Sequence, residues 1–118
     1  MKNKVQLITY IDRFGNSNIS EFHLFLNQHL AKYIQGGIHL LPFFTNIDGA
    51  DAGYDPIDHK EVDSRLGNWD DIHNLSKDFD LVVDLIVNHI SDESKEFKTV
   101  LKEGRNSPFF DLFLTKDK

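Results

Sequence analysis

The chain has 118 residues, the size of one ordinary domain, and its 40% hydrophobic content with 10 Phe is sufficient to form a core. Its 13 Lys and Arg residues against 19 Asp and Glu residues give a formal net charge of −6, which disfavours nucleic acid as a partner because phosphate backbones are bound by clustered basic side chains. The chain has no Cys, no signal peptide and no membrane span, so we expect a cytoplasmic protein without disulfides or a membrane partner.

The first part of the chain predicts a strand, a helix and a second strand. Residues 5–10 are apolar and rich in β-formers, which indicates a strand. Over residues 20–34 apolar side chains recur at spacings of three and four, and Gly36 follows where helices commonly end, so we predict a helix. Residues 38–44 form a nearly continuous apolar run, which is typical of a strand buried on both faces of a parallel sheet.

The remaining part predicts a long loop, a helix, a strand and a helix. The loop covers residues 45–68, after which Asn68 can cap a helix that carries Asp70 and Asp71 in its first turn. Residues 81–88 predict a third strand and residues 93–102 a third helix. The resulting order, βαβαβα, indicates an α/β fold with a parallel sheet, either doubly wound or part of a (β/α)8 barrel.

The long loop is the most informative segment of the sequence. Loops of this length are uncommon unless they are functional or disordered, and Tyr54, Ile57 and Trp69 bring too much apolar mass for disorder. Its carboxylates suggest calcium, but an EF-hand would need side-chain ligands where Ala50 and Ala52 stand. The histidines show no zinc-binding spacing, so we predict no metal site.

The strand at 81–88 has two different faces. Leu81, Val83, Leu85 and Val87 form one apolar face, which we expect to lie against helices, and the other face carries Val82, Asp84, Ile86 and Asn88. An unpartnered buried Asp84 would cost several kcal/mol, so it must be paired or hydrogen-bonded. The sequence leaves open whether its role is structural or catalytic.

Three residues have the chemistry of a sugar-binding site. Asp51 and His89 can exchange hydrogen bonds with hydroxyl groups, and Tyr54 offers an aromatic face to a pyranose ring. On the predicted order all three lie beyond the carboxyl ends of parallel strands, where α/β proteins bind ligands.

The sequence resembles the α-amylase superfamily. Residues 84–89, with the pattern Asp-x-x-x-Asn-His, look like a conserved region at the end of the third barrel strand of that family. The loop at 51–55 is similar to the one by which glucose-binding members hold the sugar. Residues 5–10, 37–44 and 65–72 extend the resemblance to sucrose phosphorylases over nearly the whole chain.

The resemblance implies a function and roles for individual residues. It implies glucosyl transfer from sucrose to inorganic phosphate by a retaining double displacement, without cofactor or catalytic metal, in a homodimer. Asp51 and His89 would bind glucose hydroxyls, Tyr54 would stack beneath the ring where close relatives have Phe, and Asp84 and Asn88 would support the site.

The family's catalytic groups are expected elsewhere. Its nucleophile lies in an Arg-x-Asp strand and its acid in a later Glu strand, and neither pattern occurs here. We therefore expect residues 1–118 to be a truncated N-terminal portion of the catalytic barrel domain, its first three βα units, inactive alone and with no catalytic residue of its own. The alternatives are a related glucoside phosphorylase, an α-glucosidase-type hydrolase and a non-catalytic sugar-binding fragment.

Overall fold

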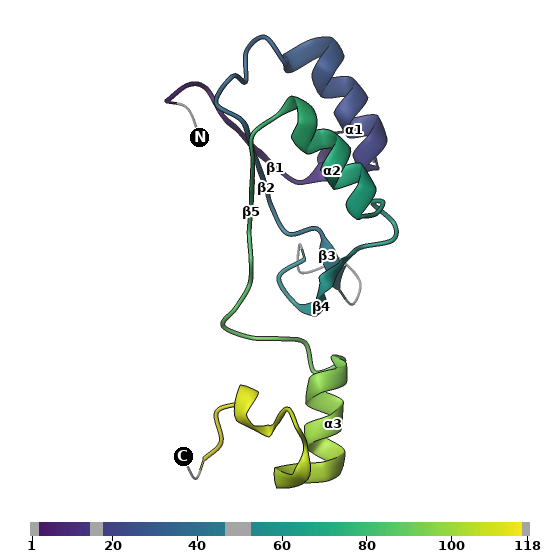
Figure 1. Cartoon of the computed structure of the whole chain (residues 1–118), viewed down its shortest axis with the longest axis vertical. Helices are drawn as coiled ribbons and strands as arrows, with labels where there is room; N and C mark the ends of the chain where they lie inside the picture. The colour runs from purple at the N-terminus through teal and green to yellow at the C-terminus, as the bar shows by residue number, and fades with distance from the viewer. Residues whose placement is uncertain (1–2, 15–17, 47–52, 117–118) are drawn as a thin grey trace.

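Most of the chain is described by a computed structural model, which covers residues 3–14, 18–46 and 53–116 (Figure 1). Short helical turns accompany the main elements at Ile11–Arg13, Gly104–Asn106 and Phe110–Leu112. The main elements are, in chain order, β1 (Leu7–Thr9), α1 (Ile19–Phe25), a π-helix η2 (Leu26–Leu30), β2 (Ile38–Leu40), β3 (Phe44–Asn46), β4 (Pro56–Val62), α2 (Trp69–Asp78), β5 (Leu81–Val83) and α3 (Lys95–Glu103).

The three predicted strands form one parallel sheet in the order β1-β2-β5. Ile38 of β2 pairs with Leu7 on one side and with Leu81 on the other, so β2 is the central strand. All three strands are shorter than the predicted ranges, and beyond β2 the ladder cannot extend through Pro42, which has no N–H. The predicted α/β class with parallel βα units is confirmed.

Helices α1 and α2 both begin after an Asn cap, of which Asn68 was predicted and Asn18 was not. Asn18 and Asn68 each form a capping box, and the Asn68 side chain accepts hydrogen bonds from the amides of Asp70 and Asp71. The first helix is α-helical only to Phe25 and continues as η2, in which the amide of Ala31 donates to the carbonyl of Leu26 at 2.8 Å.

The hydrophobic core lies between one face of the sheet and these two helices, which lie side by side (Figure 1). Ile38 and Leu40 of β2 are fully buried there. Their neighbours in the core include Ile19, Phe22 and Leu26 from the first helix and Ile72 and Leu75 from α2. The opposite face of the sheet carries Ile8, His39 and Val82, which are paired in register.

The segment predicted as one long loop contains an antiparallel strand pair. β3 pairs with β4 in an irregular register, and the amide of Asp63 donates to the carbonyl of Phe43. Its strands were not predicted because β4 carries Asp58, His59, Lys60 and Glu61 in succession and lacks apolar alternation. The loop prediction for residues 45–68 was therefore wrong for β3 and β4, while residues 47–52 lie outside the described part.

The predicted third helix is confirmed as α3, but it does not cover the sheet. It lies beyond the carboxyl end of β5 (Figure 1). Val83, Leu85 and Val87 are consequently 41%, 58% and 82% exposed, so the expectation that this face lies against helices was wrong, except for Leu81, which contacts the core. On the other face of the segment Ile86 is buried.

Candidate functional site

Side chains from three separate segments meet at the carboxyl end of the parallel sheet. Tyr10 directly follows β1, Asp84 directly follows β5, and Tyr54 precedes β4. Tyr10 and Asp84 both lie close enough to the Tyr54 phenol to raise its pKa. This end of a parallel sheet is where α/β proteins build their ligand sites.

Asp84 is held by a histidine of the central strand. His39 Nε2 lies 2.6 Å from Asp84 Oδ1, and because an ionised carboxylate only accepts hydrogen bonds, Nε2 is the donor. The pairing follows from the register. His39 lies opposite Val82, and Asp84, two residues after Val82, is on the same face of the sheet as His39. Both side chains are about 30% exposed, and the expectation that Asp84 has a partner is confirmed.

The Tyr54 phenol is part of the same cluster. Partial burial raises the pKa of Tyr54 above its ordinary value, and the neighbouring Tyr10 and Asp84 raise it further. The phenol therefore stays protonated and remains a hydrogen-bond donor at neutral pH. The Tyr54 residue is 42% exposed, which leaves part of its ring open to solvent.

The backbone around Tyr54 is fixed by two further features. His89 Nε2 donates to the Tyr54 carbonyl at 2.5 Å, which joins the segment after β5 to the segment before β4. Gly53 has a φ of +81°, and a Cβ there would come within 3.1 Å of the Pro42 carbonyl oxygen. Glycine is thus required where this segment passes the end of β2.

Strand β4 is attached to the segment that follows β5. His59 Nε2 donates to the Ile86 carbonyl at 2.5 Å, and the amide of Ser91 donates to the Pro56 carbonyl at 3.0 Å. These two bonds hold β4 beside the residues that lead to His89. The pair β3–β4 is therefore a support for the site.

The predicted site residues have different outcomes. Tyr54 and His89 lie in contact, and the contact joins the His89 side chain to the backbone carbonyl of Tyr54. Asp84 lies in the cluster, and Asn88 is exposed beside His89. Asp51 lies outside the described residues. The roles of all five residues in binding or support stay predictions.

Sequence reasoning missed His39, Tyr10 and His59. His39 could have been found, since it interrupts an otherwise apolar strand and a buried polar residue needs a partner. Tyr10 and His59 gave no comparable signal, because their neighbours are set by the three-dimensional arrangement.

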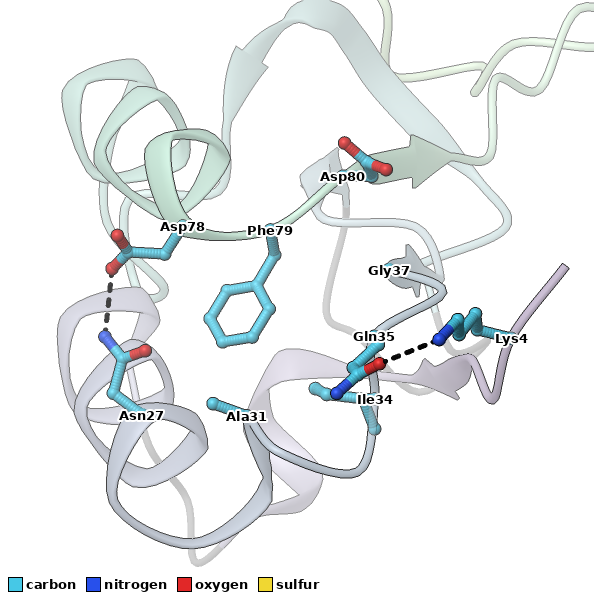
Figure 2. A pocket seen from close by; sticks show the side chains of 9 residues that line it. All are labelled: Lys4, Asn27, Ala31, Ile34, Gln35, Gly37, Asp78, Phe79 and Asp80. Carbon is cyan, nitrogen blue, oxygen red and sulfur yellow. Dashed lines mark hydrogen bonds between the residues drawn. The ribbon is translucent and has the colours of Figure 1, made fainter. Parts of the chain in front are cut away.

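A cavity of about 640 Å³ lies at the opposite, amino end of the sheet (Figure 2). Figure 2 shows Phe79 between the side chains of Asn27 and Gln35. The polar groups there bind one another: Asn27 Nδ2 donates to Asp78 at 3.0 Å and Lys4 Nζ donates to Gln35 at 3.2 Å. The polar groups of these two pairs in the cavity are therefore already engaged with each other. The exposed Tyr54 ring and His89 imidazole lie at the opposite, carboxyl end of the sheet.

The described residues show neither a metal cluster nor a membrane helix. Across residues 3–14, 18–46 and 53–116, no three His, Asp or Glu side chains are grouped so as to hold a metal ion. Within the same ranges, none of the helices combines the length and the apolar character that a bilayer crossing requires.

Comparisons with known proteins agree with this architecture. The chain is 54% identical to a sucrose phosphorylase of Bifidobacterium adolescentis over 115 residues, which is 98% of this chain and 23% of the relative. It is 49% identical to a glucosylglycerol phosphorylase of Marinobacter adhaerens over 118 residues, all of this chain and 24% of that protein.

A solved structure shows the same fold. The crystal structure of sucrose 6F-phosphate phosphorylase from Thermoanaerobacter thermosaccharolyticum matches 99% of the chain with a TM-score of 0.90 and 39% identity, over 23% of its own length. The chain thus spans about a quarter of the length of these relatives. The family model for the alpha-amylase catalytic domain matches residues 26–118, and the chain belongs to the alpha-amylase family.

Proposed function

We propose that the chain is the N-terminal portion of the catalytic barrel domain of a glucoside phosphorylase that acts on sucrose. The reaction is glucosyl transfer from sucrose to inorganic phosphate, giving α-D-glucose 1-phosphate and fructose by a retaining double displacement. The observation that carries the proposal is the 54% identity to a sucrose phosphorylase over 98% of the chain. The cluster at the carboxyl end of the sheet supports it.

Tyr54 and His89 have the exposure that a sugar site needs. The Tyr54 residue is 42% exposed and His89 is exposed, so a pyranose can reach both from the open end of the sheet. In the proposed complex Tyr54 stacks beneath the glucosyl ring, and His89 and Asp51 bind its hydroxyls. Asp84 and Asn88 support these groups.

A retaining displacement needs two carboxyl groups that flank one bond. Asp84 is engaged by His39 and is assigned to support, so we propose that the nucleophile and the general acid belong to later strands of a longer protein. Sucrose and phosphate are the proposed substrates, and a homodimer is the proposed assembly. A cytoplasmic location stays a prediction from the sequence.

The test is a chimera in which residues 1–118 replace the matching segment of the B. adolescentis sucrose phosphorylase. We expect the chimera to release glucose 1-phosphate from sucrose and phosphate. His89→Ala should lower kcat/KM by about 10- to 100-fold, because a hydrogen bond to the sugar is lost. A folded chimera without phosphorolysis would overturn the proposal.

His73→Ala is the matched control for this variant. His73 is exposed on α2, whose buried residues are Ile72 and Leu75. Its replacement should leave kcat/KM within about twofold, since exposed substitutions rarely change stability by more than about 0.5 kcal/mol. Equal losses in His73→Ala and His89→Ala would contradict the role of His89.

The substrate itself must be tested on the complete protein that carries this chain, because the relatives include phosphorylases of glucosylglycerol as well as of sucrose. Phosphorolysis of sucrose, sucrose 6F-phosphate and glucosylglycerol should be compared at equal concentrations. The highest kcat/KM with sucrose is expected. A clear preference for another glucoside would keep the reaction class and replace the substrate.

A further inference from the structure

His39 is a polar residue between two apolar neighbours in the sheet. It lies in the middle of the central strand β2, between Ile8 of β1 and Val82 of β5, on the face away from the helices. An apolar side chain would pack in that place without any polar partner. His39 instead donates a hydrogen bond to Asp84 at 2.6 Å.

From Asp84 the contacts continue to Tyr54. The Tyr54 phenol lies beside Asp84 and Tyr10, while the Tyr54 carbonyl accepts a hydrogen bond from His89. Tyr54 is thus held at two points, at its phenol and at its backbone.

An Asp carboxylate attached only to its own backbone can rotate about χ1 and χ2. A charge-assisted hydrogen bond from a neutral or charged imidazole is short and directional, and it selects one orientation. His39 lies on a strand that is paired on both sides, so the backbone that carries this donor is fixed. Fixing a binding ring in advance increases affinity because less freedom is lost when the ligand binds.

We propose that His39 is a positioning residue that orients the Tyr54 ring through the Asp84 carboxylate and thereby sets how tightly the glucosyl unit is bound. This inference rests on the proposed function, in which Tyr54 stacks on the sugar. His39 does not touch the sugar itself. Its influence passes through its hydrogen bond to Asp84 and through the proximity of Asp84 to the Tyr54 hydroxyl, which is the final link.

A double-mutant cycle in the chimera tests this inference. His39→Ala should raise KM for sucrose by about tenfold and change kcat by less than about threefold, because a ring that stacks on substrate and transition state alike contributes uniform binding. In a Tyr54→Phe background, which lacks the hydroxyl, His39→Ala should change KM by less than about twofold. The difference between backgrounds is the coupling.

Two further variants separate positioning from mere structural support. His39→Gln, whose amide can donate to Asp84, should restore KM to within about threefold of the parent. His59→Ala removes another partly buried donor, one that binds the Ile86 carbonyl, and its effect should be equal in the Tyr54 and Phe backgrounds. Equal effects of His39→Ala in both backgrounds would overturn the inference.

A spectroscopic readout separates failure of this inference from failure of the proposed function. In a chimera labelled with ¹³Cζ-tyrosine, the Tyr54 resonance is identified by its loss in Tyr54→Phe. His39→Ala should shift that resonance and His73→Ala, on the exposed side of α2, should not, whether or not sucrose is phosphorolysed. An unshifted Tyr54 resonance would refute the contact path, and a shifted one in an inactive chimera would refute only the proposed function.

Discussion

The residues up to Asp84 and the residues after it are organised differently. In the first region, sheet and helices enclose a core that includes Phe22, Leu40 and Leu75, each fully buried. In the second, as far as the structure describes it, only Ile86 is a buried hydrophobic residue, and α3 buries none of its residues. Burial of apolar side chains is thus concentrated in the first three-quarters of the chain.

The second region nevertheless has regular local structure. Ser94 caps α3 by accepting a hydrogen bond from the Phe97 amide, and Phe97 contacts Phe113 edge to face with centroids 5.5 Å apart. Yet Val87 and Leu101 remain 82% and 70% exposed. The comparison teaches that capping and periodicity suffice to define a helix, whereas stable packing needs a partner surface.

Removing a core side chain should have the largest effect and should be confined to the first region. Phe22→Ala should lower the free energy of unfolding by about 3 to 5 kcal/mol, because Phe22 is a residue of the first helix whose side chain is fully buried in the core. Urea unfolding followed by Trp69 fluorescence measures it. Trp69 is the single Trp, and its ring centroid lies 5.9 Å from that of Phe43 in the core.

Leu101→Ala is the comparison variant in α3. Leu101 is 70% exposed, so the same Trp69 transition should move by less than about 0.5 kcal/mol. If both variants lowered the free energy of unfolding by similar amounts, α3 would contribute to the core and the division into two regions would be wrong.

A second, smaller effect concerns two ion pairs, one in each region. Asp63 is 5% exposed, and its carboxylate accepts hydrogen bonds from the Arg65 amide and guanidinium. The hydrogen bonds from the Arg65 side chain lower the pKa of Asp63, and they outweigh burial, which raises it. Glu93 and Lys98 form the other pair, in which both side chains are more than half exposed.

The sign of the pH dependence follows from the Asp63 pKa. Because it is lower in the folded state, Asp63 contributes its full stabilisation above its ordinary pKa near 4, and that contribution is lost as the pH falls through the folded value. Asp63→Asn should lower the free energy of unfolding by about 1 to 3 kcal/mol at pH 7. In Asp63→Asn the free energy of unfolding should also fall less steeply below pH 4 than in the parent.

Glu93→Gln provides the matched change in the second region. An exposed pair contributes little, so the urea midpoint should be unchanged at either pH. Urea midpoints measured from pH 3 to pH 7 test both variants together. An acid decline as steep in Asp63→Asn as in the parent would show that Asp63 is not the group responsible.

The sequence predicted the βα units better than the strand pair β3–β4. The helices were predictable because their caps and apolar spacing are local signals, as at Asn68. The pair was not, because β4 owes its conformation to partners such as Phe44 and to the bond between His59 and Ile86, which no local pattern encodes. The conformation of β3 and β4 is therefore set by tertiary contacts and not by local sequence.

The candidate site shows the same limit. Tyr54 and His89 could be placed at the strand ends because parallel topology brings those ends together. The bond between His39 and Asp84 depends on the register of β2 against β5, and a shift of one residue would turn His39 toward the helices. Register was not available from the sequence, so the partner of His39 could not be named, although a polar residue in an apolar strand indicates that a partner exists.

Removing either of two helix caps should change the free energy of unfolding least. The two removals together test whether the regions before and after Asp84 unfold separately. Asn68→Ala and Ser94→Ala each remove a side-chain acceptor at a helix start, a change of about 1 kcal/mol. Because α2 is part of the core layer, Asn68→Ala should lower the free energy of global unfolding by that amount. Ser94→Ala should open α3 alone.

Amide hydrogen exchange distinguishes global from local opening. In Asn68→Ala, exchange should accelerate about fivefold at the core amides of Ile38 and Leu41, which donate to the Asp80 and Thr9 carbonyls, since these open only when the sheet unfolds. In Ser94→Ala, exchange should accelerate within α3 while Ile38 stays unchanged. Faster exchange at Ile38 in Ser94→Ala would mean that the second region, despite its exposed apolar side chains, is energetically coupled to the first.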